Sequence, residues 1–274
     1  MSSSDLSNSS NSTVFRLNDS ECIACAGSAF KSLGPPVLQR SKPSPYSVIA
    51  CTTCGLQRAY PPPTLAELDT FYRNYGDGSR ASPVVMDLFR KYAWHPWRSS
   101  QIVRLVKKFA PVGPILGYGC GKGRLIRALN KAGFSEVIGI DYSHDNVSRL
   151  REEGPDVRQG SDPASAGLPD QSLSCLVASH VIEHLLDPTD FMAKAYRLLI
   201  PGGVLITAVP SRTSLRARLG ESDWHHVDPP NHQWSFDLVS FQRLVQRHHF
   251  ECIHNKNNLF VNELLNVSRN NPNI

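Results

Sequence analysis

The sequence has no hydrophobic run that approaches the roughly 20 apolar residues a membrane-spanning helix needs. Its N-terminus also lacks the apolar core of a secretory signal and the arginine-rich pattern of a transit peptide, so we expect a cytoplasmic protein. Charge is sparse as well. Charged residues make up 19% of the 274 residues, and the formal net charge is only +5. This mildly basic balance permits an anionic substrate but does not by itself indicate nucleic-acid binding.

The distribution of cysteine does not indicate a disulfide framework. The seven cysteines are an odd number, and four of them form two C-x-x-C pairs separated by 25 residues. Each pair can present two thiolates to one ion, and four thiolates complete the tetrahedral coordination that zinc prefers. A redox-active pair is the alternative. We expect a structural zinc site whose ligands are Cys22, Cys25, Cys51 and Cys54. The other cysteines, Cys120, Cys175 and Cys252, are expected to pack in or near the core.

Proline and low-complexity stretches divide the chain into four parts. Serine and asparagine dominate the first residues, the cysteine pairs follow, and Pro61-Pro62-Pro63 then interrupts the chain. After these prolines, Thr64 and Glu67 match a capping box that opens a helix. In chain order we expect a disordered tail at 1–20, a zinc-ribbon-like segment at 21–60, a helical linker at 61–111 and a larger domain at 112–274.

The larger domain alternates apolar strand patterns with helical patterns. Such alternation predicts right-handed β-α-β units around a parallel sheet, that is, a doubly wound α/β fold of Rossmann-like type. Ligands of these sheets bind at the carboxyl ends of the strands. Ser143 is expected to cap the second helix, and Pro201-Gly202-Gly203 to end the third. The predicted strands are 114–118, 136–140, 156–159, 173–179 and 203–209. The predicted helices are 122–133, 144–153, 189–199 and 236–249.

A glycine-rich loop follows the first of these strands, and an acidic residue ends the second. Glycines let backbone N–H groups approach a ligand closely, and a carboxylate in this place can accept hydrogen bonds from a ribose diol. The dinucleotide fingerprint G-x-G-x-x-G does not fit, because its sixth position, counted from Gly119, is Arg124. The spacing is G-x-G-x-G instead, ending at Gly123. With Asp141 following 18 residues later, the pattern indicates a nucleoside-cofactor site.

Five motifs in order resemble those of class I S-adenosylmethionine (SAM)-dependent methyltransferases. They are Gly117–Gly123, Gly139–Asp141, Leu168–Ser172, His180–Leu185 and Leu199–Gly203, within a resemblance that covers roughly residues 98–250. The resemblance implies that residues 112–274 are a SAM-binding methyltransferase domain, in which the loop glycines admit the methionine portion and Asp141 binds the ribose hydroxyls. The cofactor contacts that it implies are Gly119, Cys120, Gly121, Gly123, Asp141, Tyr142 and His180.

Two positions depart from the family pattern. Gly117 stands where the family usually has an acidic residue in the loop, and Ser174 or Cys175 stands where it usually has an aspartate in the fourth strand. The first acid helps to hold the methionine ammonium end or the loop. A methyltransferase-like protein that binds without turnover is therefore an alternative to an active enzyme.

The segment from His225 to Phe236 resembles the substrate-side loop of small-molecule methyltransferases related to the ubiquinone-biosynthesis O-methyltransferases. That grouping includes deoxysugar C-methyltransferases with an N-terminal cysteine ribbon. His232 or His184 is the candidate general base for an acceptor hydroxyl, because imidazole titrates near neutrality. The alternative is that His232 orders its turn while Ser235 caps the helix that comes next.

Charged residues after the fourth and fifth strands leave further alternatives. Some quinone-pathway relatives bind a divalent cation at the stretch that contains Glu183 and His184, but His180 replaces one of the expected acids here, so we do not predict that metal. Three arginines after the fifth strand either hold a phosphate or carboxylate of the acceptor or form a solvated helix face. They are Arg212, Arg216 and Arg218.

Together these patterns predict a SAM-dependent methyltransferase acting on a small-molecule acceptor such as a sugar, a quinone-like ring or a lipid-linked intermediate. An RNA methyltransferase guided by the ribbon is another alternative, although the ribbon has few cations and aromatic residues with which to hold nucleic acid. The C-terminal part shows one clear strand at Phe250–Ile253 and a weak second near Asn258–Val261. We therefore expect a shortened or rearranged end of the sheet.

Overall fold

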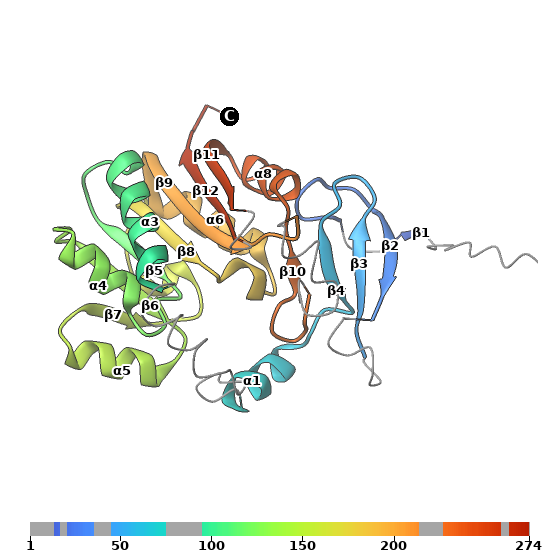
Figure 1. Ribbon diagram of the computed structural model, residues 1–274, viewed down its shortest axis with the longest axis horizontal. Coiled ribbons are helices and arrows are strands. Elements are labelled where there is room, and N and C mark those ends of the chain that lie inside the picture. The colour runs from blue at the N-terminus through green and yellow to red at the C-terminus, as the bar shows by residue number, and fades with distance from the viewer. Residues whose placement is uncertain are drawn as a thin grey trace, which may run out of the picture.

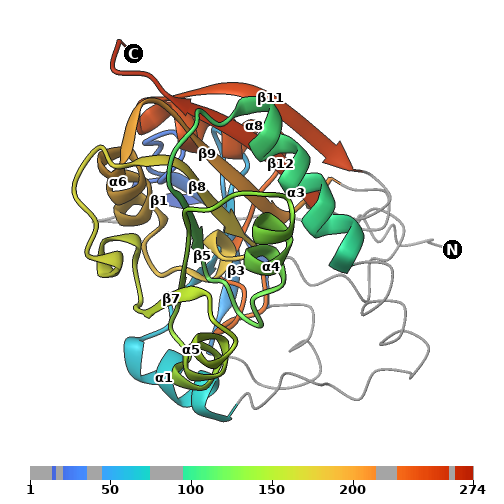
Figure 2. The same cartoon turned by 90° about the vertical axis from the view of Figure 1, so that its left-hand side faces the viewer.

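The computed structural model describes residues 14–16, 21–35, 45–74, 95–213, 227–258 and 263–273. These residues form two β-sheets that lie next to each other, with helices packed around the larger one (Figure 1 and Figure 2). The predicted α/β class is therefore confirmed.

The larger sheet has seven strands in the order β11-β12-β9-β8-β5-β6-β7. Neighbours from β9 to β7 are parallel, whereas β12 runs antiparallel to β9 and β11 antiparallel to β12. The order of the strands reverses between β5 and β8, which is where open sheets of this kind bind ligands. The strands are β5 (Ile115–Tyr118), β6 (Val137–Asp141), β7 (Asp156–Gln159), β8 (Leu173–Ser179), β9 (Leu199–Pro210), β11 (Phe250–Asn258) and β12 (Glu263–Asn270).

Helices cover both faces of this sheet, as a doubly wound fold requires. On one face, Ile102 and Val106 of α3 (His95–Phe109) share a core with Ile126 of α4 (Arg124–Lys131). On the other, Phe191 of α6 (Pro188–Leu198) and Phe241 of α8 (Leu238–Arg247) are buried in a second core. Further helical elements within the described residues of the larger part are α5 (His144–Glu152), η3 (Pro163–Ala166) and η4 (Ile182–His184). None of the described helices has both the length and the apolar character that crossing a membrane demands.

The predicted end of α6 is confirmed to within one residue, whereas the predicted cap of α8 is wrong. α6 ends at Leu198, so Pro201-Gly202-Gly203 lies inside β9, where the pairing with β8 shifts register between Leu173 and Cys175. This irregularity accommodates the extra residues of the proline-glycine turn. α8 is capped by Asp237 through a capping box with Ser240, and the predicted cap Ser235 belongs to a strand instead. The Ser143 cap of α5 is confirmed, since its side chain accepts a hydrogen bond from Asn146 N.

The end of the larger sheet is complete, which corrects the expectation of a shortened edge. β12 begins at Glu263, beyond the weak strand predicted near residues 258–261, of which 259–261 lie outside the described residues. The sequence of β12 does not show the usual pattern of a buried strand, because Asn266, Ser268 and Asn270 are polar residues at buried strand positions. Each has a partner: Ser268 Oγ donates to Asn266 Oδ1 at 2.6 Å, and Asn270 Nδ2 donates to Leu199 O at 2.8 Å. Hydrogen bonding thus makes polar side chains compatible with an interior strand.

The smaller sheet contains the cysteine segment and is antiparallel. Its strand order is β1-β2-β3-β4-β10, so its last strand comes from the C-terminal half of the chain. β1 also lies within the segment predicted to be a disordered tail, which is a correction for those three residues. The strands are β1 (Val14–Arg16), β2 (Ala29–Gly34), β3 (Ser47–Cys51), β4 (Gln57–Tyr60) and β10 (Trp234–Ser235). We call β1 to β4 and the cysteine turns between them the ribbon.

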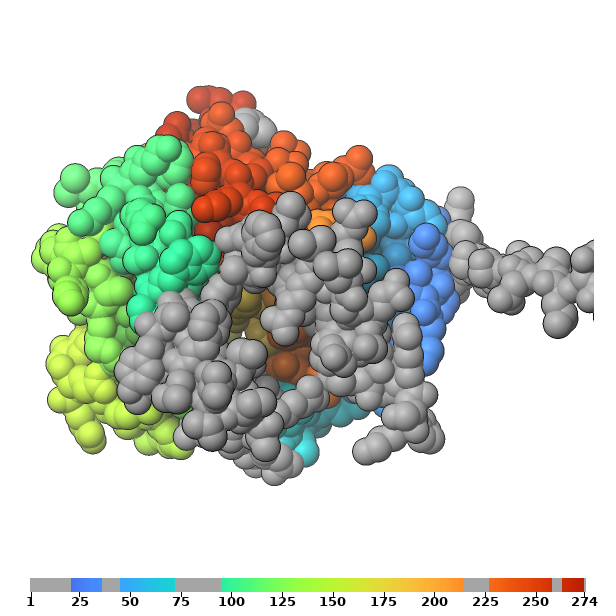
Figure 3. Space-filling model, viewed as in Figure 1, coloured from blue at the N-terminus to red at the C-terminus, as the bar shows by residue number. Residues whose placement is uncertain are grey.

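The ribbon shares a hydrophobic core with the larger part. Phe30, Ile49 and Leu56 of the ribbon are buried in the same cluster as Phe236 and Leu244. In the space-filling view, ribbon atoms coloured blue directly adjoin orange atoms of the C-terminal half (Figure 3). The two sheets therefore pack as neighbouring parts of one hydrophobic interior.

A short helix connects the ribbon with the far side of the larger sheet. α1 (Leu65–Asn74) opens with the predicted capping box, in which Thr64 N donates to Glu67 Oε2 at 2.7 Å and Glu67 N to Thr64 Oγ1 at 3.2 Å. Tyr46 of the ribbon donates to Glu67 Oε1 at 2.8 Å, while Tyr142, after β6, donates to Asp69 Oδ1 at 3.2 Å. α1 thus lies beneath the gap between the two sheets in Figure 1.

The shared core predicts that the ribbon and the larger part unfold together. Phe30→Ala removes a ring that is 1% exposed and should lower the free energy of unfolding by about 3–5 kcal/mol. Urea denaturation followed by both circular dichroism and tryptophan fluorescence should give one coincident transition. The control Val112→Ala, at a fully exposed site, should change stability by less than about 0.5 kcal/mol. A separate early transition in Phe30→Ala would contradict the shared core.

Candidate functional site

The glycine loop lies at the carboxyl end of β5 and has a backbone that side chains would obstruct. Gly119 has a positive φ of 67°, and a Cβ built there would lie 2.5 Å from Val181 Cγ2. Cys120 N donates to Ile140 O at 2.9 Å, which fixes the loop to the end of β6. Glycine is therefore needed at position 119 for both conformation and space.

Asp141 ends β6 beside this loop and is already tied to it. Its Oδ2 accepts a hydrogen bond from Gly121 N at 2.6 Å, and its Oδ1 accepts one from Ser143 N at 3.0 Å. Tyr142, the next residue, is 58% exposed. Oδ1 also accepts from Asn146 Nδ2 at 3.3 Å, so the capacity of Asp141 to accept a further hydrogen bond from a ligand lies on Oδ2.

A cavity of about 180 Å³ lies between the loop, α3 and the end of β8. Among its lining residues are the cationic side chains Arg98, Lys122 and Arg124. Gly117, where the family resemblance leads one to expect an acid, lines the same cavity, and a Cβ there would lie 2.8 Å from Ile126 Cδ1. These side chains can bind an anionic group such as a carboxylate in the described part of this cavity.

The second departure, in the fourth strand, lies away from this site. Ser174 is at the beginning of β8, and its Oγ donates to Pro114 O at 2.9 Å, next to the start of β5. Cys175 faces Ile115 in the same register. The loop and the cavity are at the other end of these strands. Loss of an acid at this position therefore leaves the geometry at the carboxyl ends unaffected.

Buried charged residues form a network next to the cavity. Arg98 Nε lies 2.7 Å from Glu263 Oε1, and Arg98 Nη2 donates to Ser179 Oγ at 2.9 Å. His180 Nε2 lies 2.8 Å from the same Glu263 oxygen, and its Nδ1 lies 3.2 Å from Glu183 Oε1. Burial raises the pKa of Glu263, an effect that the charge of Arg98 opposes. The imidazole of His180 is thus held between two carboxylates.

The backbone at His180 adopts a left-handed conformation, which determines the direction in which the imidazole leaves the main chain. Its φ is +55°, and its N–H donates to Ala208 O at 2.7 Å immediately after β8 ends. Strained backbone of this kind is maintained where the surrounding structure fixes it, often at functional sites. Sequence reasoning named His180 but missed Arg98 and Glu263, since each comes from an element whose position beside β8 is visible only in the fold.

His184 has a defined tautomer. Its Nδ1 lies 3.0 Å from the carbonyl oxygen of Asn231, which can only accept, so Nδ1 carries the proton and Nε2 has the lone pair. Burial lowers the pKa of His184, with the Glu183 carboxylate opposing the shift. The ring packs edge to face against His232, with centroids 4.7 Å apart. The structure therefore brings the two predicted base candidates together.

Glu183, His184 and His232 each offer one ligand atom within 4.8 Å of the others. Both carboxylate oxygens of Glu183 are buried and have no hydrogen-bond partner within the described residues. A carboxylate and two imidazoles are donors that divalent metals accept, so this trio could also hold an ion.

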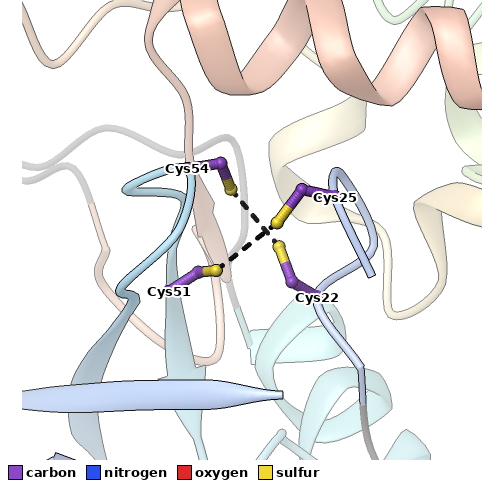
Figure 4. A group of neighbouring side chains, drawn as sticks. All are labelled: Cys22, Cys25, Cys51 and Cys54. Carbon is purple, nitrogen blue, oxygen red and sulfur yellow. Dashed lines mark hydrogen bonds between the residues drawn. The ribbon is translucent and has the colours of Figure 1, made fainter. Parts of the chain in front are cut away.

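The four predicted metal ligands converge from two turns of the ribbon (Figure 4). Cys22 Sγ lies 3.4 Å from Cys54 Sγ, and Cys25 Sγ lies 3.6 Å from Cys51 Sγ. These separations approach the edge of about 3.8 Å in a tetrahedron with metal–sulfur bonds of about 2.3 Å. The hydrogen bond between Cys22 and Cys54 lowers the pKa of Cys22 and raises that of Cys54, so one thiolate is favoured within this pair. The geometry fits a tetrahedral ion held by sulfur.

The remaining cysteines and the predicted arginines lie in different parts of the fold. Cys175 is fully buried, while Cys120 and Cys252 are half-buried against the core, as expected. Arg212 forms an ion pair with Asp237 at the start of α8. Its charge is thus already partnered within the protein. The other two arginines of the predicted anion site, Arg216 and Arg218, lie outside the described residues, as do His225 and His226.

A family model described as "Methyltransferase domain" matches residues 87–255 of the chain. The match contains the glycine loop, Asp141, the η4 residues and His232.

Curated relatives match over shorter segments. A probable SAM-dependent methyltransferase of Mycolicibacterium smegmatis is 38% identical over 103 residues, which are 36% of this chain and 38% of that protein. A ubiquinone biosynthesis O-methyltransferase of Caulobacter vibrioides is 31% identical over 135 residues, which are 44% of this chain and 51% of that protein. The chain thus spans about half or less of the length of these relatives.

Solved structures share the fold. A SAM-dependent methyltransferase of Thermotoga maritima, described as a possible histamine N-methyltransferase, aligns with a TM-score of 0.52 and 21% identity. The alignment covers 68% of this chain and 96% of that one. At this identity the similarity concerns the fold alone.

The buried network predicts a penalty for removing its fixed cation. Arg98→Met leaves two buried carboxylates beside a histidine, and it should lower the free energy of unfolding by about 3–5 kcal/mol in urea titrations. The double variant Arg98→Met/Glu263→Gln should recover part of that loss, because one of the two uncompensated charges is gone. Equal losses in the single and double variants would show that packing, not charge, is responsible.

Proposed function

The chain belongs to the methyltransferase domain family, and from this premise we propose that it transfers a methyl group from SAM to a hydroxyl of a small molecule. The predicted membership of the class I SAM-dependent methyltransferases is confirmed by the family match and by the fold. The observation that carries the acceptor proposal is His184, a half-buried imidazole with a lowered pKa whose Nε2 has a lone pair beside the end of β8.

The cofactor would be held by the residues at the carboxyl ends of β5 and β6. The loop from Gly119 to Gly123 would admit the methionine portion, with Cys120 in its backbone, and Asp141 would accept hydrogen bonds from the ribose hydroxyls. Tyr142 is exposed next to Asp141 and would cover the adenine. Arg98 is added to this set: it lines the cavity beside the loop and is suited to the methionine carboxylate. Bound SAM supplies an electrophilic methyl group.

The acceptor would lie on the side of η4 and β10. His184 takes the proton of the acceptor hydroxyl on Nε2, because its Nδ1 is committed to Asn231 O. Its low pKa keeps it unprotonated at neutral pH, so it is ready to act as a base. His232 packs against this ring and limits its orientation. His180, fixed by two carboxylates, would contact the cofactor side.

The small-molecule class is supported by similarity to ubiquinone biosynthesis O-methyltransferases and by the modest charge of the ribbon. A sugar, a quinone-like ring and a lipid-linked intermediate all present suitable hydroxyls. RNA is the competing acceptor class. Binding of RNA that weakens steeply with added salt would favour it over a small molecule.

The cofactor of the ribbon would be one structural zinc ion held by Cys22, Cys25, Cys51 and Cys54. Support comes from sulfur positions close to tetrahedral edges and from a lowered pKa at Cys22. Four protein ligands leave no open coordination position, which makes the role structural. A purified chain without bound zinc and with all four of these thiols reactive would contradict this assignment.

Gly119→Ala tests the cofactor site. The new Cβ would meet Val181 and needs a left-handed backbone, so the dissociation constant of S-adenosylhomocysteine should rise at least tenfold in calorimetry. Gly133→Ala is the matched control, because its φ is also positive (94°) but nothing lies within 4 Å of the added atom. Its affinity should stay within twofold of the wild type. Equal weakening in both variants would indicate general strain rather than a blocked site.

Methyl transfer itself is tested with labelled SAM and a panel of small catechols, hydroxybenzoates and sugars. His184→Asn can keep a donor toward Asn231 O but lacks the lone pair of Nε2, so turnover should fall by about 10²-fold or more. Binding of S-adenosylhomocysteine should be unchanged, and His249→Asn, at an exposed site, should keep full activity. Tight cofactor binding without transfer to any acceptor would favour the non-catalytic alternative raised by Gly117.

A further inference from the structure

The ribbon sheet reaches the proposed acceptor site through a strand of two residues. Trp234 and Ser235 of β10 pair antiparallel with Arg58 and Gln57 of β4. The guanidinium of Arg58 also lies over the Trp234 ring, 5.2 Å from its centroid. His232 is only two residues from this pairing. Any movement of β4 is therefore transmitted to the segment that carries His232.

Gln233 forms hydrogen bonds both with β4 of the ribbon and with η4 of the larger part. Its carbonyl oxygen accepts from Ala59 N of β4 at 2.9 Å. Its own N–H donates to Glu183 O at 2.8 Å, and its side-chain Nε2 donates to His184 O at 2.9 Å. The residue is 3% exposed. A buried side-chain amide needs such partners, so this arrangement is specific for glutamine.

Trp234 extends the same contact by one residue. Its Nε1 donates to Leu185 O at 2.7 Å. Three consecutive carbonyl groups, those of Glu183, His184 and Leu185, are thus held by Gln233 and Trp234. Since both candidate base histidines are adjacent to these bonds, the orientation of the imidazoles depends on them.

On the ribbon side, β4 starts directly after the second cysteine turn. Cys51 N donates to Leu56 O at 2.9 Å, so closure of this turn fixes where β4 begins. The first turn is tied to the larger part, because Arg247 Nη1 of α8 donates to Cys22 O at 2.8 Å. An ion that joins the two cysteine turns would therefore clamp β4 against α8 and β10.

We propose that Gln233 is a positioning residue that couples occupation of the four-cysteine site to the orientation of His184 and His232. This inference rests on the proposed function for its catalytic meaning, whereas the coupling itself is a property of the hydrogen bonds. The glycine loop follows β5, and Asp141 is the last residue of β6. Neither of these strands pairs with the ribbon sheet. Loss of the coupling should therefore disturb the acceptor side and spare cofactor affinity.

The experiment uses the full chain loaded with zinc and records the histidine ring signals by long-range ¹H–¹⁵N spectroscopy. Chelation that releases one zinc, with the appearance of four reactive thiols, identifies the ion as that of the ribbon. In the wild type this release should shift the ring signals of His184 and His232, assigned with His184→Asn, and leave those of the exposed His144 unchanged.

Gln233→Met keeps the backbone bonds but removes the side-chain donor to His184 O. With zinc still bound, it should displace the His184 signals, and chelation should then add less than half of the wild-type shift. The dissociation constant of S-adenosylhomocysteine should stay within twofold. Gln246→Met, on the exposed face of α8, is the matched control and should behave as the wild type.

Trp234→Phe provides a second variant if Gln233→Met fails to fold, since it removes the donor to Leu185 O and keeps a smaller aromatic ring in that place. Unchanged His184 and His232 signals after zinc release from the wild type would overturn the coupling. Unchanged His184 signals in a folded Gln233→Met, or in Trp234→Phe where that variant replaces it, would overturn the positioning role. Failure of the wild type to bind S-adenosylhomocysteine would instead count against the proposed function, because the ring signals are measured without cofactor or acceptor.

Discussion

The pairing of β10 with β4 is the constraint on which the relation between the two sheets depends. A strand of two residues contributes little by itself, but it is enclosed by a core that both sheets share. Because main-chain hydrogen bonds fix register, the ribbon cannot slide along the larger sheet without breaking buried bonds. The cysteine turns, the short helix η4 and the loop that carries His232 are consequently parts of one arrangement, although they lie far apart in the sequence.

The other organising feature is charge buried at the carboxyl ends of the strands. Arg98, His180, Glu183 and Glu263 place two carboxylates and two nitrogen bases in a region of low solvent access. The guanidinium of Arg98 compensates the buried Glu263 carboxylate, and the imidazole of His180 lies between Glu263 and Glu183. The left-handed backbone of His180 is one result. A methyl donor with a positive sulfur would meet a site whose electrostatics are already set before it binds.

Short sequence patterns correctly predicted those features of the fold that depend on residues close together in the chain. The glycine spacing, Asp141 after its strand and the capping box at Thr64 each specify a conformation within a few residues, and the structure contains all three. The two cysteine pairs were also sufficient to predict their meeting. In contrast, Arg98, Glu263 and Gln233 carry no local signal, because their partners come from strands or helices distant in sequence. β12 was not predicted as a strand, because it contains asparagines, which are more common in loops than in strands. From the sequence, Ser174 is noted only as a departure from the family pattern, and its place at the start of β8, at the opposite end of the strand from the loop, follows from the fold alone.

The long separation of interacting residues has a consequence for synthesis of the chain. Arg247 bonds to the carbonyl of Cys22, 225 residues earlier, and Glu263 of β12 completes the network around Arg98 and His180. Until β12 has left the ribosome, Arg98 has no Glu263 and the larger sheet has no antiparallel edge. Nascent chains therefore expose an unpaired β9 and an incomplete site, a state in which edge pairing with other chains competes with folding. The charged cluster around Arg98 and His180 is thus completed only after β12 has been synthesised, although Arg98 itself is made more than 160 residues earlier.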